Sequence, residues 1–200
     1  MKQELKSELT KQLIISKAFD LFYENGFKNT SIDRIMKATD LSKGAFYHHY
    51  GSKKELGLEV ISLKVQKRVV DGMISPLNRP GNSLELLESV FIDRLRAFPF
   101  YDKQNGCPMN NLINEIGNDE SVYQTALRNI IEQWKSALIQ LLERGKQAGE
   151  IKREVSSSAV AIYLISAFEG IRGIRKLYHE DSVLEDYLKG LSMYLEQIKV

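Results

Sequence analysis

The sequence predicts an all-α protein, with an N-terminal three-helix helix-turn-helix domain and a C-terminal helical bundle, about nine helices in all. Three observations predict this class. Apolar residues mostly recur at helical spacing, no region alternates polar and apolar residues for long, and only four prolines interrupt 200 residues. The prolines and glycines also mark where the helices end.

Four helices are expected in the N-terminal part, over residues 7–25, 31–38, 42–49 and 52–74. Asn25-Gly26 provides a left-handed stop for the first helix. The other three begin at hydroxyl side chains that can cap a helix, which are Ser31 (or Thr30), Ser42 and Ser52.

A loop rich in proline and glycine, over residues 75–82, begins the C-terminal part. Five further helices are expected, over residues 83–98, 109–117, 119–147, 156–178 and 183–198, of which the third begins at Asp119 or Ser121. We therefore expect two domains, a helix-turn-helix domain over 1–52 and a ligand-binding and dimerisation domain over 53–200.

The charge of the chain is unevenly distributed. Residues 1–54 contain ten Lys or Arg against six Asp or Glu, which gives +4, whereas the whole chain carries only +2. The remaining residues therefore carry −2. A basic N-terminal part attached to a slightly acidic body is typical of phosphate binding, although the sign of the charge alone is weak evidence.

The start of the third expected helix has the residue types that a helix needs to enter the major groove of DNA. Ser42, Gly44 and Ala45 are small enough for close approach, and Lys43 can reach a base or a phosphate. The rings of Tyr47 and His48 follow one turn later. The second expected helix begins with the hydroxyls and backbone amides of Thr30 and Ser31, and the fourth begins with Lys53. The residues expected to contact DNA are Thr30, Ser31, Ser42, Lys43, Gly44, Ala45, Tyr47, His48 and Lys53.

The block from Gly26 to Leu56 resembles the N-terminal domain of the TetR family of bacterial transcriptional regulators. The matching segments are Gly26-Phe27, Thr30-Ser31-Ile32, Ile35, Leu41-Ser42-Lys43-Gly44, Phe46-Tyr47-His48-His49-Tyr50 and Ser52-Lys53-Lys54-Glu55-Leu56. The resemblance implies a homodimer that binds a palindromic double-stranded DNA operator, usually as a repressor that a small-molecule effector releases. The turn Ala38-Thr39-Asp40-Leu41 departs from the Ala-Gly-Val common in the family, but Asp40 tolerates a left-handed backbone.

The last two expected helices carry apolar stripes that could join two subunits. In the family that the sequence resembles, the final two helices of each subunit form a four-helix interface. The candidate interface residues are Leu164, Ile171, Leu184, Leu188, Leu191 and Leu195. The alternative is that both stripes face the core of their own subunit.

The body is also expected to hold an effector, because regulators of this kind bind ligands there. The candidate lining residues are Phe98, Tyr101, Cys107, Tyr123, Trp134, Tyr163, Phe168, Glu169 and Arg172. Each aromatic residue taken singly could be core, and Glu169 with Arg172 could bridge two subunits instead of orienting a ligand. Cys107 precedes Pro108 at a helix start, where amides would stabilise a thiolate, so an electrophile or oxidant response is one hypothesis and an inert buried thiol is the other.

An enzyme is not expected. The residues three before His48, His49 and His179 are not glutamates, so the paired motif of a di-iron bundle is absent, and no zinc or nucleotide motif is present. We expect no metal and no cofactor.

No uninterrupted apolar run approaches ~20 residues and no secretory signal precedes the first helix, so we expect a cytoplasmic protein without membrane association. A body that docks a protein partner is the main alternative to one that binds a small molecule.

Overall fold

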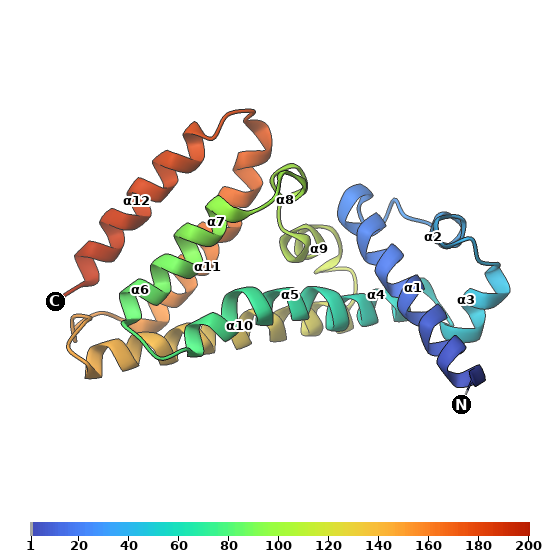
Figure 1. The fold of residues 1–200 in the computed structure, drawn as a ribbon, viewed down its shortest axis with the longest axis horizontal. Coiled ribbons are helices and arrows are strands. Elements are labelled where there is room, and N and C mark those ends of the chain that lie inside the picture. The colour runs from blue at the N-terminus through green and yellow to red at the C-terminus, as the bar shows by residue number, and fades with distance from the viewer. Residues whose placement is uncertain (1) are drawn as a thin grey trace. The chain divides into compact units, whose positions relative to one another are not determined.

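The computed structural model describes residues 2–200. In that part of the chain, helices account for nearly all regular structure, and the only extended pairing is an isolated antiparallel bridge between Ile151 and Lys199 (Figure 1). The all-α class predicted from the sequence is therefore confirmed.

The α-helices of the described chain are α1 (Lys2–Asn25), α2 (Ile32–Thr39), α3 (Lys43–His49), α4 (Lys53–Val60), α5 (Lys67–Val69), α6 (Ser83–Glu88), α7 (Arg94–Ala97), α8 (Phe100–Asn105), α9 (Pro108–Ile116), α10 (Ser121–Gln147), α11 (Ser157–Ile174) and α12 (Ser182–Ile198). Wider π-helical turns continue several of them, over Ile61–Gln66, Val70–Ile74 and Ser89–Asp93. Short 3₁₀ turns follow at Ser75–Asn78 and Arg175–Leu177.

The nine helices expected from the sequence are all present. The helical residues run without a break from Lys53 to Ile74 and from Ser83 to Ala97, so α4 with α5, and α6 with α7, correspond to one expected helix each. The first helix begins five residues earlier than expected. The short helix α8 was not predicted; it follows α7 directly, with Phe98 as the C-cap of α7 and Pro99 as the N-cap of α8.

The contacts within the chain divide it into two compact units. The first comprises the described residues up to Lys67 together with Pro108–Arg128, and the second comprises Arg68–Cys107 together with Asn129–Val200. The helix-turn-helix domain expected over 1–52 thus belongs to a larger unit that also takes in α4, α9 and the start of α10. Two helical runs, α4–α5 and α10, contribute to both units.

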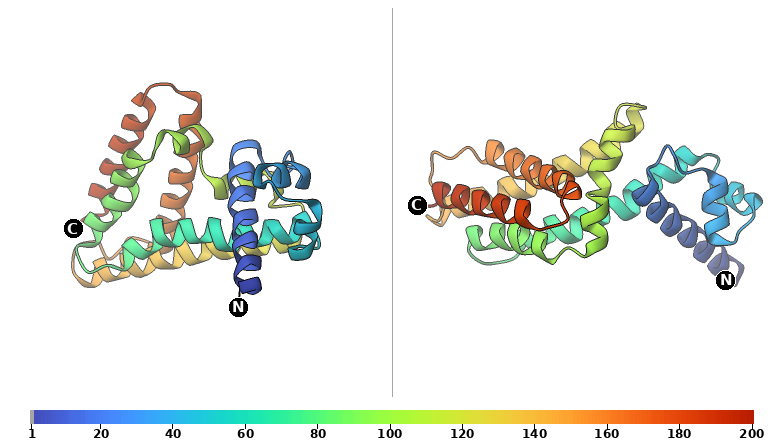
Figure 2. Two further views of the ribbon diagram at one scale, coloured as in Figure 1. Left: turned by 45° about the vertical axis from the view of Figure 1, so that its right-hand side comes forward. Right: turned by 90° about the horizontal axis from the view of Figure 1, so that it is seen from above.

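In the first unit, α1 packs against α2 and α4, and α3 packs against α2. Ile14, Ile15 and Ala18 of α1 are fully buried, as are Ile35 of α2 and Phe46 of α3. These positions repeat at helical spacing, so burying them fixes one face of each helix and leaves the other face to solvent. The blue helices of Figure 2 show this arrangement within the unit.

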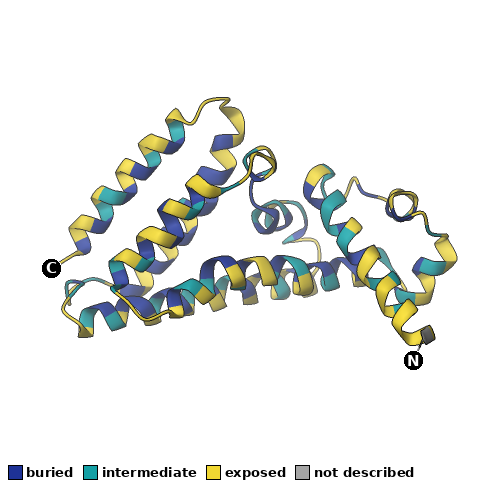
Figure 3. Cartoon of the chain, in the orientation of Figure 1, coloured by how far each residue is buried: buried dark blue, intermediate teal, exposed yellow. Residues whose placement is uncertain are grey.

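In the second unit, an aromatic cluster forms the centre of the core. Trp134 of α10 stacks on Phe91, with ring centroids 6.0 Å apart, and Phe168 of α11 meets both rings edge-on. All three side chains are buried. The helices α11 and α12 pack against this core with one buried and one exposed stripe each (Figure 3).

One helical segment of the described chain, Ser157–Leu177, has the length and mean hydropathy (1.2) of a membrane span. Within the subunit, 44% of that segment is buried, as in the core helix of a globular protein. The segment is therefore weak evidence for a membrane.

Candidate DNA-binding surface and effector pocket

The helices α2 and α3 form a capped pair joined by a tight turn. The Ser31 hydroxyl accepts a hydrogen bond from the amide of Arg34, and the Ser42 hydroxyl accepts one from the amide of Ala45. Asp40 ends α2 with a left-handed backbone (φ 55°), which aspartate tolerates better than most residues. The turn expected from the sequence therefore survives the absence of glycine.

The face of α3 that the sequence predicted to meet DNA is exposed. Phe46 is buried and Tyr50 nearly so, which directs the opposite side of the helix outward. Tyr47 is 58% exposed. The exposed or partly exposed side chains of this face are Ser42, Lys43, Gly44, Ala45, Tyr47 and His48. A short helix with small residues at its start and polar or aromatic groups one turn later can enter a major groove.

Lys43 is already paired on this surface. Its Nζ lies 2.7 Å from Oδ1 of Asp33 in α2, and both side chains are more than 60% exposed. The hydrogen bond to Asp33 raises the pKa of Lys43. A DNA phosphate would have to compete with this carboxylate for the lysine.

Thr30 lies elsewhere than expected. Its side chain is fully buried, and its hydroxyl donates to the carbonyl oxygens of Gly26 (2.7 Å) and Leu21 (3.2 Å). The hydroxyl thus completes the end of α1 and is not offered to a phosphate. Ser31 is exposed, as expected.

Lys53 begins α4 as expected, but it is partly buried. Its Nζ lies 4.4 Å from the centroid of the Phe27 ring and donates to the carbonyl oxygen of Lys28 at 3.4 Å. Burial lowers the pKa of Lys53. The lysine thus supports the loop before α2 as well as adding positive charge beside it.

A carboxylate from α9 holds the same loop. Glu115 accepts a hydrogen bond from the Phe27 amide at 2.7 Å and another from the Lys28 amide at 2.5 Å. The Lys28 side chain pairs with Asp119 at 3.1 Å. The sequence analysis missed these contacts, because Glu115 lies almost ninety residues from its partners and no local pattern connects them.

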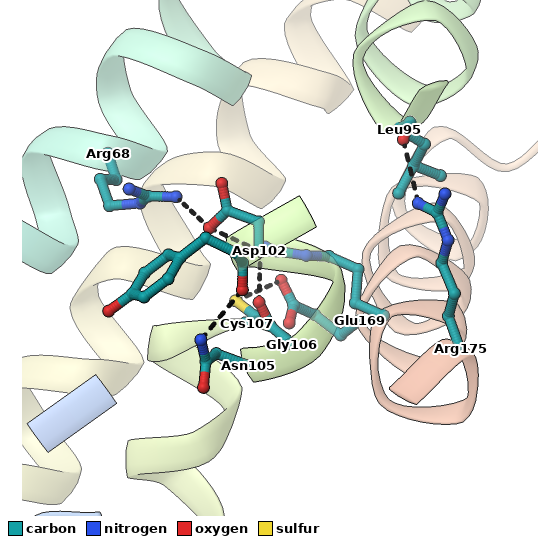
Figure 4. Close-up of polar contacts among 10 residues, drawn as sticks. Arg68, Leu95, Asp102, Asn105, Gly106, Cys107, Glu169 and Arg175 are labelled. Atoms are coloured by element: carbon teal, nitrogen blue, oxygen red, sulfur yellow. Dashed lines mark hydrogen bonds and ion pairs between the residues drawn. The ribbon is translucent and has the colours of Figure 1, made fainter. Parts of the chain in front are cut away.

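In the second unit, three of the expected ligand residues, Cys107, Glu169 and Arg172, form a polar cluster beside a fourth, Phe98. Figure 4 shows Cys107 and Glu169 with their neighbours. The Cys107 thiol donates to Oε1 of Glu169 at 3.3 Å, and Arg172 donates to the Gly106 carbonyl oxygen at 2.6 Å. The Arg172 guanidinium also lies 4.5 Å from the centroid of the Phe98 ring. Burial raises the pKa of Glu169, against the opposing effects of Arg172 and the thiol.

A cavity of about 340 Å³ opens beside this cluster. Its lining includes residues that the sequence analysis did not single out, Arg68, Asp71, Arg94, Pro99 and Asp102, together with Phe98, which it did. Arg68 donates to Asp102 at 2.7 Å. Among the charged residues of this lining, Asp102 is buried whereas Arg68 and Asp71 are exposed, so no local pattern in the sequence marks this site.

The other expected ligand residues are dispersed. Trp134 and Phe168 belong to the aromatic core, and Tyr101 and Tyr163 are 40% and 50% exposed. Tyr123 belongs to the first unit, where its ring lies 5.7 Å from that of Phe27 and burial raises its pKa to about 12. Of these five residues, Phe168 also borders the polar cluster, because its ring centroid lies 6.2 Å from that of Phe98 and 5.6 Å from the Arg172 guanidinium.

The six residues expected at a subunit interface are buried within a single chain. Leu164, Ile171, Leu184, Leu188, Leu191 and Leu195 are all at most 4% exposed. They pack in the core of their own subunit, which was the alternative to a subunit interface for the apolar stripes of the last two helices. The apolar side chains that α11, α12 and the turn between them expose are Ile162, Tyr163, Ile174, Leu177, Tyr178 and Met193.

Comparison with known proteins agrees with this architecture. Residues 14–60 match the family model of bacterial regulatory proteins of the tetR family, and residues 84–191 match the model of a tetracyclin repressor-like C-terminal domain. The transcriptional regulator UidR of Escherichia coli strain K12 is 32% identical over 168 residues, which cover 84% of this chain and 82% of UidR. The transcriptional repressor DhaR of Mycobacterium sp. strain GP1 is 25% identical over 185 residues, 89% of this chain and 88% of DhaR.

A solved structure shares the fold over nearly the whole chain. The crystal structure of a TetR transcriptional regulator from Chloroflexus aurantiacus J-10-FL superimposes with a TM-score of 0.86 at 26% identity. The superposition covers 97% of this chain and 98% of the other.

Proposed function

The chain belongs to the tetR family of bacterial regulatory proteins and is a DNA-binding transcriptional regulator, and from that premise we propose how it works. It binds a palindromic operator as a homodimer in the cytoplasm, represses transcription there, and leaves the operator when a small molecule enters the second unit. The observation that carries this proposal is the exposed face of α3, on which Lys43, Tyr47 and His48 surround the small residues Ser42 and Gly44.

Dimerisation is supported by the surface that α11 and α12 leave uncovered. Tyr163 of α11 and Tyr194 of α12 contact each other with ring centroids 4.6 Å apart and ring planes tilted by 44°, beside the exposed Ile162. On α11, Gly170 and Gly173 are exposed, and a Cβ added at either would meet open space. Small residues beside exposed apolar side chains allow a second copy to approach closely.

The route from effector to DNA is supported by the connection at Cys107–Pro108, where the chain passes from the second unit to the first. On one side, α8 and Gly106 belong to the polar cluster of Figure 4. On the other side, α9 carries Glu115, which holds the amides of Phe27 and Lys28 just before the helix-turn-helix. An effector that moves α8 therefore acts on a segment covalently joined to the support of the DNA-reading helices.

A second candidate signal is an electrophile at Cys107. The thiol lies 3.3 Å from Glu169 Oε1, which places a carboxylate oxygen within reach of the thiol proton. Attack of sulfur on the alkene carbon of a maleimide forms one C–S bond, while the thiol proton passes to Glu169 and the maleimide enolate is protonated by water. We therefore expect N-ethylmaleimide to weaken operator binding by the unmodified chain and not by Cys107→Ser, with Glu169→Gln reacting more slowly; an equal response of the Ser variant would exclude Cys107.

The DNA-binding proposal is tested by selecting sites from a pool of random duplexes and measuring affinity for the recovered sequence by fluorescence anisotropy. We expect an inverted repeat whose half-sites lie about 34 Å apart or a multiple of it. Lys43→Ala and Tyr47→Ala should each weaken binding about tenfold. The matched control is Lys146→Ala, which removes a lysine that is ion-paired with Glu143 on α10. Unchanged affinity in both α3 variants would refute the placement of DNA on α3.

A further inference from the structure

The cavity described above is unusually rich in guanidinium groups. Arg68 and Arg94 line it, and Arg172 lies beside it, 4.0 Å from Asp102 and 4.5 Å from the centroid of the Phe98 ring. These arginines come from α5 and the helices α7 and α11, so the fold of the second unit, and no local sequence motif, brings them together. Positive charge gathered from three separate helices against one wall favours an anion.

Arg94 is the member of this group whose charge is least satisfied. Its Nε is buried and has no hydrogen-bond partner among the described residues. Its pKa is lowered by burial and then by the positive charges of Arg68 and Arg172, against Asp102 and Asp71. A partly desolvated guanidinium with a buried donor to spare gains most from an added acceptor.

The position of Arg94 depends on a glycine. A Cβ added at Gly72 would lie 2.1 Å from a terminal nitrogen of the Arg94 guanidinium. Because any side chain at position 72 would displace that group, the glycine creates the space in which the guanidinium faces the cavity.

The cavity already holds one carboxylate of the chain itself. Asp102 of α8 is 7% exposed and accepts a hydrogen bond from Arg68 at 2.7 Å. Figure 4 shows the two side chains pointing toward each other. Arg68 is therefore oriented so that a carboxylate in the cavity can accept its hydrogen bond.

The rest of the lining is apolar and limits the size of a ligand. Ala97, Phe98 and Pro99 form one wall, and the Phe98 ring lies between the guanidinium groups of Arg94 (5.6 Å) and Arg172 (4.5 Å). A volume of about 340 Å³ is at the small end of the range of ligand sites. Asp71 and Asp102 offset the positive charges of Arg68 and Arg94 in the lining, so the cavity has no large excess of positive charge to attract a dianion.

We propose that this cavity binds a small monocarboxylate with an apolar or aromatic body, whose carboxylate pairs with the guanidinium of Arg94 and competes with Asp102 for Arg68. The inference rests on the proposed function in one respect, since it makes this class of molecule the effector. When the ligand replaces Asp102 at Arg68, the ion pair that holds α8 to α5 breaks. The helix α8 leads through Gly106 and Cys107 into α9.

The test uses the full chain without DNA and benzoate as the probe, with benzamide as its neutral match. Isothermal titration and the shift of the thermal unfolding midpoint report binding. We expect benzoate to bind and to raise the midpoint, benzamide to do neither, and phenyl phosphate to bind at least about tenfold more weakly than benzoate. Equal binding of benzoate and benzamide, or tighter binding of phenyl phosphate, would overturn the assignment.

Variants locate the site. Arg94→Gln should lose the benzoate response, whereas Arg96→Gln, an exposed arginine two residues along α7 that pairs with Glu185, should keep it. Asp102→Asn removes the internal competitor and should tighten benzoate binding about tenfold. If Arg94→Gln fails to fold, Gly72→Ala repeats the test, because it displaces the guanidinium and keeps its charge. A full benzoate response in Arg94→Gln or in Gly72→Ala would place the anion elsewhere.

A separate measurement keeps this inference distinct from the proposed function. Anisotropy of the selected operator is recorded with and without benzoate. Benzoate binding accompanied by release of DNA supports both the site and its role as effector site. Absence of operator binding by the unliganded protein refutes the proposed function, while the titration without DNA still decides whether the cavity binds a carboxylate.

Discussion

Asp33 of α2 and Lys43 of α3 form an ion pair across the helix-turn-helix, with 2.7 Å between Oδ1 and Nζ. Both residues belong to the surface that we assign to DNA, so the acidic partner reduces the charge available to a phosphate. The pair joins two short helices at their exposed ends, where an ion pair contributes little to stability. Its main effect is therefore expected on DNA binding.

We predict that Asp33→Asn tightens operator binding about two- to fivefold at low salt, because Lys43 is then free to contact a phosphate. The gain should shrink as the salt concentration rises, since phosphate contacts are salt-dependent. Anisotropy titrations at about 50 and 200 mM salt measure both effects. Glu143→Gln, which releases Lys146 on α10, is the control, and a similar gain in that variant would count against a contact at Lys43.

Glu115→Ala should destabilise the first unit, because it leaves the Phe27 and Lys28 amides without their acceptors. Hydrogen bonds to charged groups contribute about 1.5–3 kcal/mol. We expect a loss of that size in urea unfolding and faster hydrogen exchange of the two amides. Asp119→Asn breaks only the exposed ion pair with the Lys28 side chain and should cost less than about 1 kcal/mol. Equal losses in the two variants would contradict the role given to Glu115.

Ile162→Asp should convert a dimer to a monomer, because it places a charge on the exposed apolar face of α11 beside the contacting rings of Tyr163 and Tyr194. The measurement is light scattering coupled to size exclusion. Val122→Asp is the matched control, since Val122 is 40% exposed against 44% for Ile162 and lies in the first unit, outside the proposed interface. A dimer that persists in Ile162→Asp would place the contact on another surface.

The stability of the chain should depend on the ionisation of Glu169. Burial raises the pKa of this carboxyl above 4.5, so the folded state binds its proton more tightly than the unfolded state. Its contribution to stability is therefore present at low pH and is lost as the pH rises through the folded-state pKa. Arg172 and the Cys107 thiol, the groups that face it, reduce the effect without reversing it.

Glu169→Gln removes this titration. We predict that the free energy of unfolding of the variant, relative to the unmodified chain, is higher at about pH 8 than at about pH 4. Urea unfolding at the two pH values measures the difference. A difference that does not change with pH would show that Glu169 titrates with the same pKa in the folded and unfolded states.

Local features of the fold could be predicted from the sequence because each depends on residues close to one another in the chain. The caps at Ser31, Ser42 and Ser52 and the stop at Gly26 determine helix ends directly. The exposed face of α3 carries Ser42, Lys43 and Gly44, which the residue types at the helix start had singled out. The helix α8 was not predicted, because a helix of six residues gives too short a pattern to recognise.

Contacts between distant segments could not be predicted. Glu115 meets the loop before α2, and Arg68 meets Asp102, only because the helices that carry them pack together. The apolar stripe of α12 illustrates a different limit, since periodicity shows that Leu184 and Leu188 share a face without showing what covers it. Thr30 is a third case, because its hydroxyl fills the end of α1 and no local pattern distinguishes that role from a phosphate contact.

The ion pair between Arg68 and Asp102 also bears on how sensitive the regulator can be. A carboxylate tethered within its own binding cavity acts as a competitor at an effective concentration in the millimolar range. The concentration of a free carboxylate must exceed the effective concentration of Asp102 before the ligand occupies the site. The regulator would therefore respond to such compounds only at high concentration. At the proposed site, Asp102 would therefore set the concentration at which a carboxylate binds, and exchanging it for a neutral residue would lower that concentration without changing the DNA-reading helices.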